Sequence, residues 1–191
     1  DPYWFFCFRN KINIIKMKNK LNKYTVSVYT ENSVGLLNRI SAIFQRRHIN
    51  IESFNSSITE IEDVHRWTIL VFTTESYIKK IVGQINKQVE VIKAYFHTDD
   101  ETIYQESCLF KIKSSLLFDD RQIQNIIKKS NAIIVTVNKD FFVIEKSGRT
   151  NELDDLYEKL SKYGILQYVR SARIAVTKSP LMISEILSDF K

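Results

Sequence analysis

The chain has 191 residues, 44% hydrophobic and 26% charged, with four glycines, two prolines and a formal net charge of +6. This is ordinary globular composition for one average domain or two small ones, and the scarcity of glycine and proline argues against long flexible linkers. No run of eighteen apolar residues predicts a transmembrane helix, and the isolated Cys7 and Cys108 form no metal or redox motif, which favours a reducing compartment.

The positive charge is concentrated in residues 1–23, which hold six basic residues and one acidic residue. The remaining chain has 22 basic and 21 acidic residues, so it is nearly neutral and gives little support for a nucleic-acid-binding surface. The charges of the first segment follow its apolar residues, which is the reverse of a signal peptide. We interpret residues 1–23 as a leader or extension without ordered structure, with Met17 as the expected start.

The pattern of residues 24–98 predicts the element order β-α-β-β-α-β. Tyr24–Thr30 alternates with period two, which is typical of a strand. "INIESFNSSI" and "VHRWTILVFT" predict two more strands joined by the polar turn "EIED", and "VEVIKAYFH" predicts a fourth. Apolar residues at helical spacing predict two amphipathic helices, one marked by Leu36, Leu37, Ile40, Ile43 and Phe44 and the other by Ile78, Ile81, Val82, Ile85 and Val89.

The acidic residues 99–106 are expected to be a linker, after which residues 107–178 repeat the same order. "CLFKIK" predicts a strand, and a helix is expected from near Asp119. "AIIVTV" and "FFVIEK" are expected to pair around the turn "NKD". A second helix is expected from Thr150 or Asn151 to a stop at Gly164, followed by "ILQYVRSARIAV" as one last strand.

The two repeats predict an α+β fold. It consists of two tandem ferredoxin-like domains, each an antiparallel sheet with two helices on one face. Residues 179–191 are expected to be a tail, in which Ser179 and Pro180 could begin a short helix.

The sequence offers little for catalysis or metal binding. His48, His65 and His97 have no spacing that puts two of them on one helical face. No glycine-rich phosphate loop or nucleophile elbow is present, and "TDDET" is better explained as a solvated linker than as an acid–base pair. RNA-binding domains of this topology carry stacking aromatic residues in a Gly-Phe element, which is missing here.

The turn "NSVG", residues 32–35, is the feature that best suggests a ligand. The first N–H groups of a helix lack partners and carry the positive end of its dipole, so a carboxylate can bind there without a lysine. Gly35 would let the ligand approach the backbone, and the amides of Asn32 and Asn50 could bind its ammonium or carboxylate. In the alternative interpretation, these three residues only form turns. The pattern alone leaves both possibilities open.

Several ordered blocks resemble the small, regulatory subunit of acetohydroxyacid synthase, also called acetolactate synthase. The later ones are "NIES" from Asn50, R-x-T-I from Arg66, "QINKQVEVIKAY", "ESCLFKI" and "YVRSARIAV". Together the blocks cover residues 24–176, and their order makes the resemblance specific. The first block, E-N-x-x-G-x-L-x-R-[IV], is carried by Glu31, Asn32, Gly35, Leu37, Arg39 and Ile40.

The resemblance implies that the first domain is an ACT domain. Such domains pair side by side as a homodimer and bind an amino acid at the interface, and in this family the amino acid is usually valine. The backbone N–H groups of Gly35 and Leu36 are expected at its carboxylate, with Val34 and Ile51 as walls for the isopropyl group. The effector site that the resemblance implies consists of Asn32, Val34, Gly35, Leu36, Asn50 and Ile51.

The resemblance also implies a chain that does not catalyse. It is expected to bind the large catalytic subunit, which carries thiamine diphosphate, Mg²⁺ and FAD and joins two pyruvates, or pyruvate and 2-oxobutyrate, with release of CO₂. It is expected to stimulate that enzyme and to confer feedback inhibition by valine in branched-chain amino acid biosynthesis. The expected location is the bacterial cytoplasm, or alternatively the plastid stroma.

Two other functions are carried as alternatives. The first is a stand-alone ACT-domain amino-acid sensor with another target. The second is an acylphosphatase-like enzyme, which would need an arginine and an asparagine at one phosphate-binding loop, whereas Arg39 lies on the expected helix.

Overall fold

The structure, a computed structural model, describes residues 21–119 and 121–180. The chain divides into two compact units. The first contains the chain up to Ile103 and from Val176 onward, and the second is Tyr104–Ala175. The predictions for the leader and for the C-terminal tail lie largely outside the described residues.

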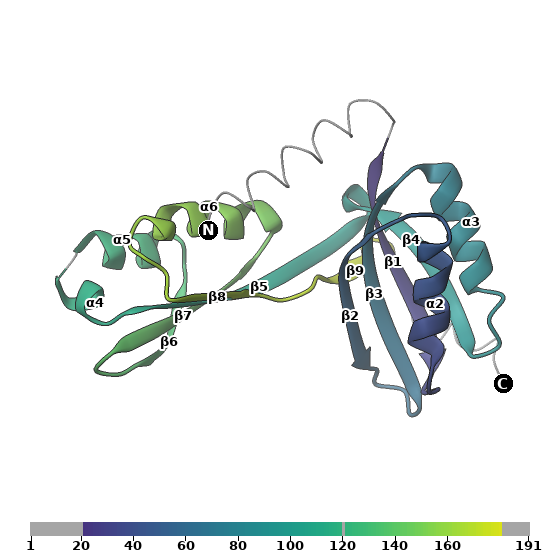
Figure 1. The fold of residues 1–191 in the computed structure, drawn as a ribbon, viewed down its shortest axis with the longest axis horizontal. Helices are drawn as coiled ribbons and strands as arrows, with labels where there is room; N and C mark the ends of the chain where they lie inside the picture. Colours follow the sequence, from purple (N-terminus) through teal and green to yellow (C-terminus); the bar gives the residue numbers. More distant parts are fainter. Residues whose placement is uncertain (1–20, 120, 181–191) are drawn as a thin grey trace. The chain divides into compact units, whose positions relative to one another are not determined.

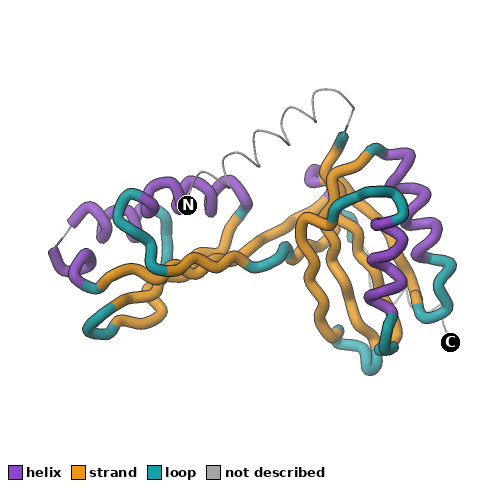
Figure 2. The backbone as a smooth tube through the Cα atoms, in the orientation of Figure 1, coloured by secondary structure: helices purple, strands orange, loops and turns teal. Residues whose placement is uncertain are grey.

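The first unit is a four-stranded antiparallel sheet with two helices on one face (Figures 1 and 2). Its strands lie in the order β2-β3-β1-β4. This is the ferredoxin-like arrangement, so the fold predicted for this part of the chain is confirmed. The elements are β1 (Asn22–Glu31), α2 (Leu36–Gln45), β2 (Ile51–Ile58), β3 (Val64–Thr73), α3 (Glu75–Ile85) and β4 (Val91–Thr98).

The hydrophobic core of this unit lies between the sheet and the two helices. β1 contributes Tyr24, Val26 and Val28 at every second position, as its alternation predicts. The helices contribute one apolar face each: Leu36, Ile40, Ile43, Phe44, Ile78, Ile81, Val82 and Ile85. This packing fixes both ends of α2, and it therefore positions the turn on either side of that helix.

The central strand β1 is buried on both faces. Thr25, Ser27 and Tyr29, on the face opposite to the helices, are also almost fully buried. β1 pairs with β3 on one side and with β4 on the other, and the Tyr29 ring lies 6.2 Å from that of Tyr95 on β4. Alternation distinguishes the two faces of a strand, but it does not predict that both are buried.

The second unit repeats this order with a less regular end. Its strand order is β6-β7-β5-β8, and β9 also pairs with β5. The predicted hairpin of β6 and β7 is confirmed, and the Asn138 side chain in its turn accepts a hydrogen bond from Phe141 N–H (2.9 Å). The elements are β5 (Thr102–Lys113), α4 (Ser115–Asp119), α5 (Arg121–Lys129), β6 (Ile133–Val137), β7 (Phe141–Gly148), α6 (Thr150–Ser161), β8 (Gln167–Arg170) and β9 (Ile174–Thr177).

Residues 99–106, predicted as a linker, are instead a 3₁₀ turn, η1 (Asp99–Glu101), and the first part of β5. The Glu101 carboxylate accepts hydrogen bonds from the backbone N–H (2.8 Å) and the hydroxyl (3.0 Å) of Thr98. Thr102 and Glu106 are buried in phase with the later core positions of β5. The acidic composition concealed this period-two pattern in the sequence.

The predicted helix through Val89 is shorter in the structure. α3 ends at Ile85, and Val89 is 92% exposed. The Asn86 side chain donates to Ala94 C=O (2.9 Å) and accepts from Ala94 N–H (2.7 Å), which ties the helix end to β4. Leu37, predicted on the buried face of α2, is 48% exposed.

The single last strand that the sequence predicts is two strands. β8 ends at Arg170 and β9 begins at Ile174. Between them Ser171 stays attached to β5, because its N–H donates to Ser107 C=O (2.8 Å) and its hydroxyl accepts from Ser107 N–H (2.8 Å). The helix expected near Asp119 is likewise two short helices, α4 and α5.

Candidate functional site

The turn between β1 and α2 holds Asn32, Val34, Gly35 and Leu36 of the predicted site. Gly35 has a φ of 83°, in the left-handed region that favours glycine. A Cβ atom on Gly35 would meet no atom within 4 Å. Within one chain, Gly35 is therefore required by the backbone conformation, and the space around it is open.

The N-terminus of α2 is open to solvent. No side chain caps its first N–H groups, and its first turn has no acidic residue. Asn32, Val34 and Gly35 are exposed, whereas the side chain of Leu36 is fully buried and anchors the first turn. The positive end of the helix dipole therefore faces solvent beside the amide of Asn32, an arrangement that suits a carboxylate.

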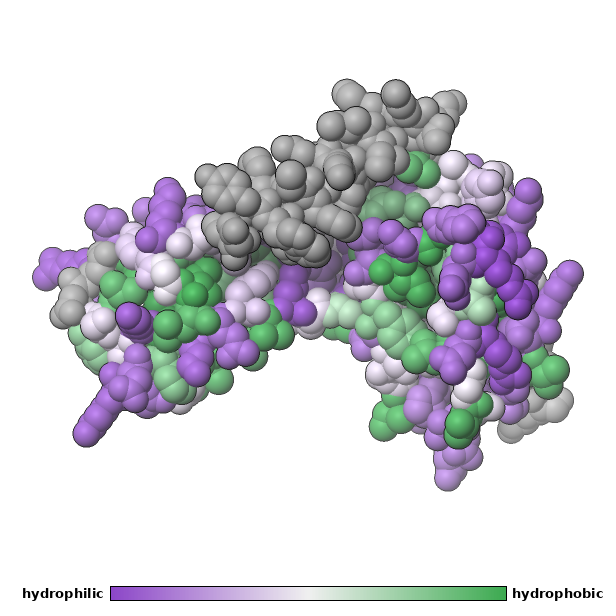
Figure 3. Space-filling model, in the orientation of Figure 1, coloured by the Kyte–Doolittle hydropathy of each residue, from purple (hydrophilic) through white to green (hydrophobic). Residues whose placement is uncertain are grey.

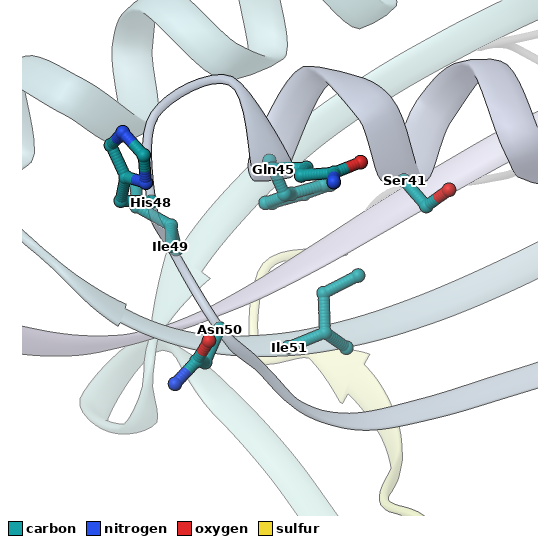
Figure 4. A pocket seen from close by; sticks show the side chains of 7 residues that line it. Ser41, Gln45, His48, Ile49, Asn50 and Ile51 are labelled. Carbon is teal, nitrogen blue, oxygen red and sulfur yellow. The ribbon is translucent and has the colours of Figure 1, made fainter.

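The other two predicted residues, Asn50 and Ile51, lie beyond the opposite end of α2. The chain reverses there through His48, which has a φ of 54°. Figure 4 shows the Ile51 side chain directed toward α2 and the Asn50 amide directed away from that helix. An open hollow of about 340 Å³ at this end is lined by Ser41, Phe44, Gln45, His48, Ile49, Asn50 and Ile51.

One copy of the chain does not bring these two groups together. Ten residues of α2 separate them, and a helix of that length rises roughly 15 Å, more than one amino acid spans. We call residues 32–36 the turn half-site, and Asn50 and Ile51 with the hollow the hollow half-site. Ser41, Gln45 and His48 belong to the hollow but were not predicted, because nothing in their spacing marks them.

Glu90 contacts one residue on each side of the turn half-site and was also not predicted. Its backbone C=O accepts a hydrogen bond from Glu31 N–H (2.9 Å) at the end of β1. Its carboxylate accepts a hydrogen bond from Arg39 Nη2 on α2 (2.5 Å). This bond is the main reason why the pKa of Glu90 is below its usual value, and a hydrogen bond to the backbone of Glu90 itself is the second. The partners Arg39 and Glu90 are 51 residues apart, so no local pattern connects them.

The second unit contains a buried cluster of charged residues around Glu106. Arg170 donates from Nε to Glu106 (2.7 Å) and from Nη1 to Asp154 (2.8 Å). Arg173 is fully buried, and its guanidinium lies 3.5 Å from the centre of the Tyr104 ring. Two positive and two negative charges balance, as buried charges require. The arginines of the "YVRSARIAV" block therefore have a structural role.

No metal-binding cluster occurs among the described residues, because no three His, Cys, Asp or Glu side chains lie together in a way that could hold an ion. In the same part of the chain, no helix is both long and apolar enough to cross a bilayer. Cys108 is buried in the core of the second unit, and burial raises the pKa of its thiol to about 11. The thiol is therefore protonated and poorly nucleophilic at neutral pH.

The edge strand β6 exposes an apolar surface on the second unit. Four of its five side chains, those of Ile133, Ile134, Val135 and Val137, are aliphatic and more than 40% exposed. Apolar residues, drawn in green, reach the visible surface of both units in Figure 3. An exposed apolar edge strand is typical of a surface that pairs with another chain.

Comparison with known families gives matches along most of the described chain. A family model described as the AHAS small subunit-like ACT domain matches residues 26–93. A model described as the small subunit of acetolactate synthase matches residues 105–179. The two models thus correspond to the two units of the structure.

Curated relatives carry the same name. The acetolactate synthase small subunit of Mycolicibacterium smegmatis is 32% identical over 164 residues, which are 86% of this chain and 96% of the relative. The acetolactate synthase small subunit of Bacillus subtilis is 32% identical over 157 residues, or 82% of this chain and 91% of the relative. Acetolactate synthase small subunit 2, chloroplastic, of Arabidopsis thaliana is 28% identical and matches 85% of this chain but 34% of its own length.

The fold agrees with a solved structure of the same name. The crystal structure of the acetolactate synthase small subunit from Thermotoga maritima superposes with a TM-score of 0.75 at 22% identity, covering 84% of this chain and 99% of the other. The comparisons and the two ferredoxin-like units agree with the resemblance in the sequence. The chain belongs to the family of acetolactate synthase small subunits, the regulatory subunits of an enzyme whose catalysis resides in its large subunit.

Proposed function

We propose that this chain binds the catalytic large subunit of an acetolactate synthase, stimulates it, and makes it sensitive to feedback inhibition by valine. The observation that carries the proposal is the open N-terminus of α2, where Gly35 has a φ of 83° and Asn32 is exposed beside it. An uncapped helix end suits a carboxylate. A branched-chain amino acid as the molecule that carries this carboxylate is consistent with membership in the small-subunit family.

Each part of the amino acid has a matching group in the two half-sites. The first N–H groups of α2 receive the carboxylate. The amide oxygens of Asn32 and Asn50 receive the ammonium group. Val34 and Ile51 contact the aliphatic branch. Contact between these apolar groups removes their surface from water, which favours valine over a polar amino acid.

A second copy of the chain supplies what one copy lacks. β2 is an edge strand of the first sheet and begins at the hollow half-site. In a side-by-side pair related by a two-fold axis perpendicular to the sheet, the two α2 helices run antiparallel, so the turn half-site of each copy lies near the hollow half-site of the other. Val34, which is fully exposed in one copy, then contacts Ile51 of the second copy. Such a homodimer has two equivalent effector sites.

Feedback inhibition requires that valine prefer one arrangement of the dimer or of its contact with the large subunit. The coupling is on the order of 1–3 kcal/mol, and it is reciprocal in binding. The large subunit therefore changes the affinity for valine by the same factor by which valine changes the affinity for the large subunit.

The chemistry of synthesis belongs to the large subunit in this proposal. That subunit carries thiamine diphosphate, Mg²⁺ and FAD, and this chain needs none of them. Both subunits act in one compartment, which is the bacterial cytoplasm or, by analogy with the chloroplastic relative, the plastid stroma. The exposed apolar residues of β6 suit a contact with another polypeptide.

The proposal is tested by purifying the full chain with and without its large subunit. Calorimetric titration with L-valine, with L-aspartate as the control, measures effector binding, and acetolactate formation measures stimulation and inhibition. We expect co-purification, saturable binding of valine but not of aspartate, and a higher rate that valine lowers.

Two other results would each contradict one part of the proposal, the first the large-subunit partner and the second the effector site. Valine binding by a chain that does not co-purify with any large subunit would indicate a stand-alone amino-acid sensor. Co-purification and stimulation without heat from any branched-chain amino acid, in the chain or in the complex, would remove the effector site and leave the activating role.

A further inference from the structure

Glu90 accepts a hydrogen bond from one residue on each side of the turn half-site. Its backbone C=O accepts from the N–H of Glu31, the last residue of β1, at 2.9 Å. Its Oε1 accepts from Arg39 Nη2, at the end of the first turn of α2, at 2.5 Å. Residues 31 and 39 bracket the whole turn half-site, so one residue holds the segment on either side of the candidate carboxylate position.

The ion pair also changes the charge at this helix end. A cation in the first turn of a helix is disfavoured by the dipole, and a free guanidinium would attract anions to itself rather than to the backbone. Glu90 neutralises Arg39 and fixes its position. The side chain of Glu90 is only 20% exposed, and its second carboxylate oxygen is buried without a hydrogen-bond partner among the described residues. The hydrogen bond from Arg39 therefore restrains this carboxylate.

We propose that Glu90 is a positioning residue of the effector site: through Arg39 it fixes the open N-terminus of α2 relative to the end of β1. The inference rests on the proposed function. The N–H groups of α2 are then held for the ligand's carboxylate before it binds, which lowers the ordering cost of binding. Glu90 itself does not contact the ligand.

The first test is a double-mutant cycle on valine affinity, measured by calorimetry with the full chain in its complex. Glu90→Gln and Arg39→Gln each remove the ion pair, and each should weaken valine binding about fivefold, the upper end for a partly exposed pair. The double variant should be no weaker than either single variant. Glu90→Asp keeps the charge and should retain most of the affinity.

The chain offers a matched control. Glu75 and Lys79 form an ion pair of the same length, 2.5 Å, and both residues lie on the exposed side of α3. Glu75→Gln should leave valine affinity unchanged. Additive losses in the cycle, or tighter binding by Glu90→Gln because a freed Arg39 captures the carboxylate, would overturn the inference.

The second test does not depend on the effector. Amide hydrogen exchange at residues 32–38 should be faster in Glu90→Gln and Arg39→Gln than in the wild type, and unchanged in Glu75→Gln. Unchanged exchange in all three variants would overturn the inference while leaving valine binding by the wild type intact. If the wild type binds no branched-chain amino acid, the effector site of the proposed function fails, and exchange alone decides whether Glu90 positions the turn.

Discussion

The same topological position is open in the first unit and closed in the second. β1 leads into α2 through an exposed turn that ends at Gly35. β5 leads into α4 through Ser114, which is 3% exposed. Ser114 donates from its N–H to Asp140 C=O (3.1 Å) and from its hydroxyl to Asn138 C=O (2.6 Å). This turn is therefore sealed against the β6–β7 hairpin.

The two units therefore share a fold without sharing a site. Both units are ferredoxin-like, but after the first strand of each repeat the first unit has an uncapped helix N-terminus with the exposed amide of Asn32, whereas the second has the buried Ser114. In the second, Arg170 donates hydrogen bonds to both Glu106 and Asp154, and these bonds stabilise its packing. Function depends on such local features and not on the fold that carries them. We expect effector binding to depend on the first unit alone.

The largest effect is expected at Gly35, where the open turn can be closed. Gly35→Asp puts a carboxylate at the helix N-terminus, where it repels the ligand's carboxylate and occupies the same N–H groups. Valine binding should weaken by more than about 100-fold, since both the charge and the N–H donors are lost to the ligand. Calorimetry of the variant, with co-purification to verify assembly with the large subunit, measures this.

An alanine at Gly35 separates the effect of charge from that of backbone conformation, and an alanine at Gly83 is its control. Gly35→Ala keeps the site neutral but forces a φ of 83° on an alanine, which costs about 1–2 kcal/mol. It should lower stability more than it lowers affinity. Gly83→Ala, in α3 where a Cβ meets no atom within 4 Å, should stabilise the chain slightly and leave valine binding unchanged. If Gly35→Asp binds valine with the affinity of the wild type, the turn does not bind the carboxylate of the ligand.

The next largest effect, on the free energy of unfolding, is expected in the charged cluster of the second unit. Glu106→Ala leaves the buried Arg173 and the largely buried Arg170 without their shared carboxylate, so the free energy of unfolding should fall by about 3 kcal/mol. Denaturant unfolding measures this, with the exposed Glu158→Ala on α6 as control. Valine affinity should stay within twofold of the wild type. A large loss of affinity would contradict the independence of the effector site from the second unit.

Cys108 tests how well the core of the second unit is sealed. In a Cys7→Ser background, the thiol should react at pH 8 about 100-fold more slowly than a free cysteine, because its pKa is raised from 9.0 to about 11 by burial. Since the folded pKa is above the unfolded one, the native state favours the thiol. The corresponding stability is complete below pH 9 and declines as the pH rises toward 11. Labelling in native buffer and in denaturant gives the ratio, and equal rates would show an open core.

The elements were predictable because their signals are local. Alternation at Tyr24, Val26 and Val28 and helical spacing in α2 reflect which side chains face the core. The errors arose from contacts between distant segments. Asn86 ends α3 early by binding Ala94, and the bonds between Ser171 and β5 accompany the division of the last strand.

The candidate site likewise has one part that local sequence signals predict and one part that depends on contacts between distant segments. The turn half-site was predictable, because Gly35 and the start of α2 are adjacent in the sequence. Glu90 was not, because its partner Arg39 is 51 residues away. The hollow half-site was predicted only through the resemblance, at Asn50 and Ile51, since its other residues follow no pattern.

The smallest effect is expected from the two amides, and it gives the sharpest test of a shared site. Asn32→Ala and Asn50→Ala each remove one polar contact, so each dimer should bind valine about fivefold more weakly, or ~1 kcal/mol. Calorimetry of the two purified variants measures this. Unchanged affinity in either variant would remove that residue from the site.

Mixing the two variants then shows whether each site contains residues of both copies. If the two copies share each site, one site of a mixed dimer carries both substitutions, Asn32→Ala from the first variant and Asn50→Ala from the second. The other site combines the native Asn32 and Asn50, so subunit exchange restores wild-type affinity at half of the sites in the mixed dimers. If each site lies within one copy, every site keeps one defect and no recovery occurs. Asn32 and Asn50 lie beyond opposite ends of α2, which rises roughly 15 Å, so recovery on mixing directly tests the two-copy geometry.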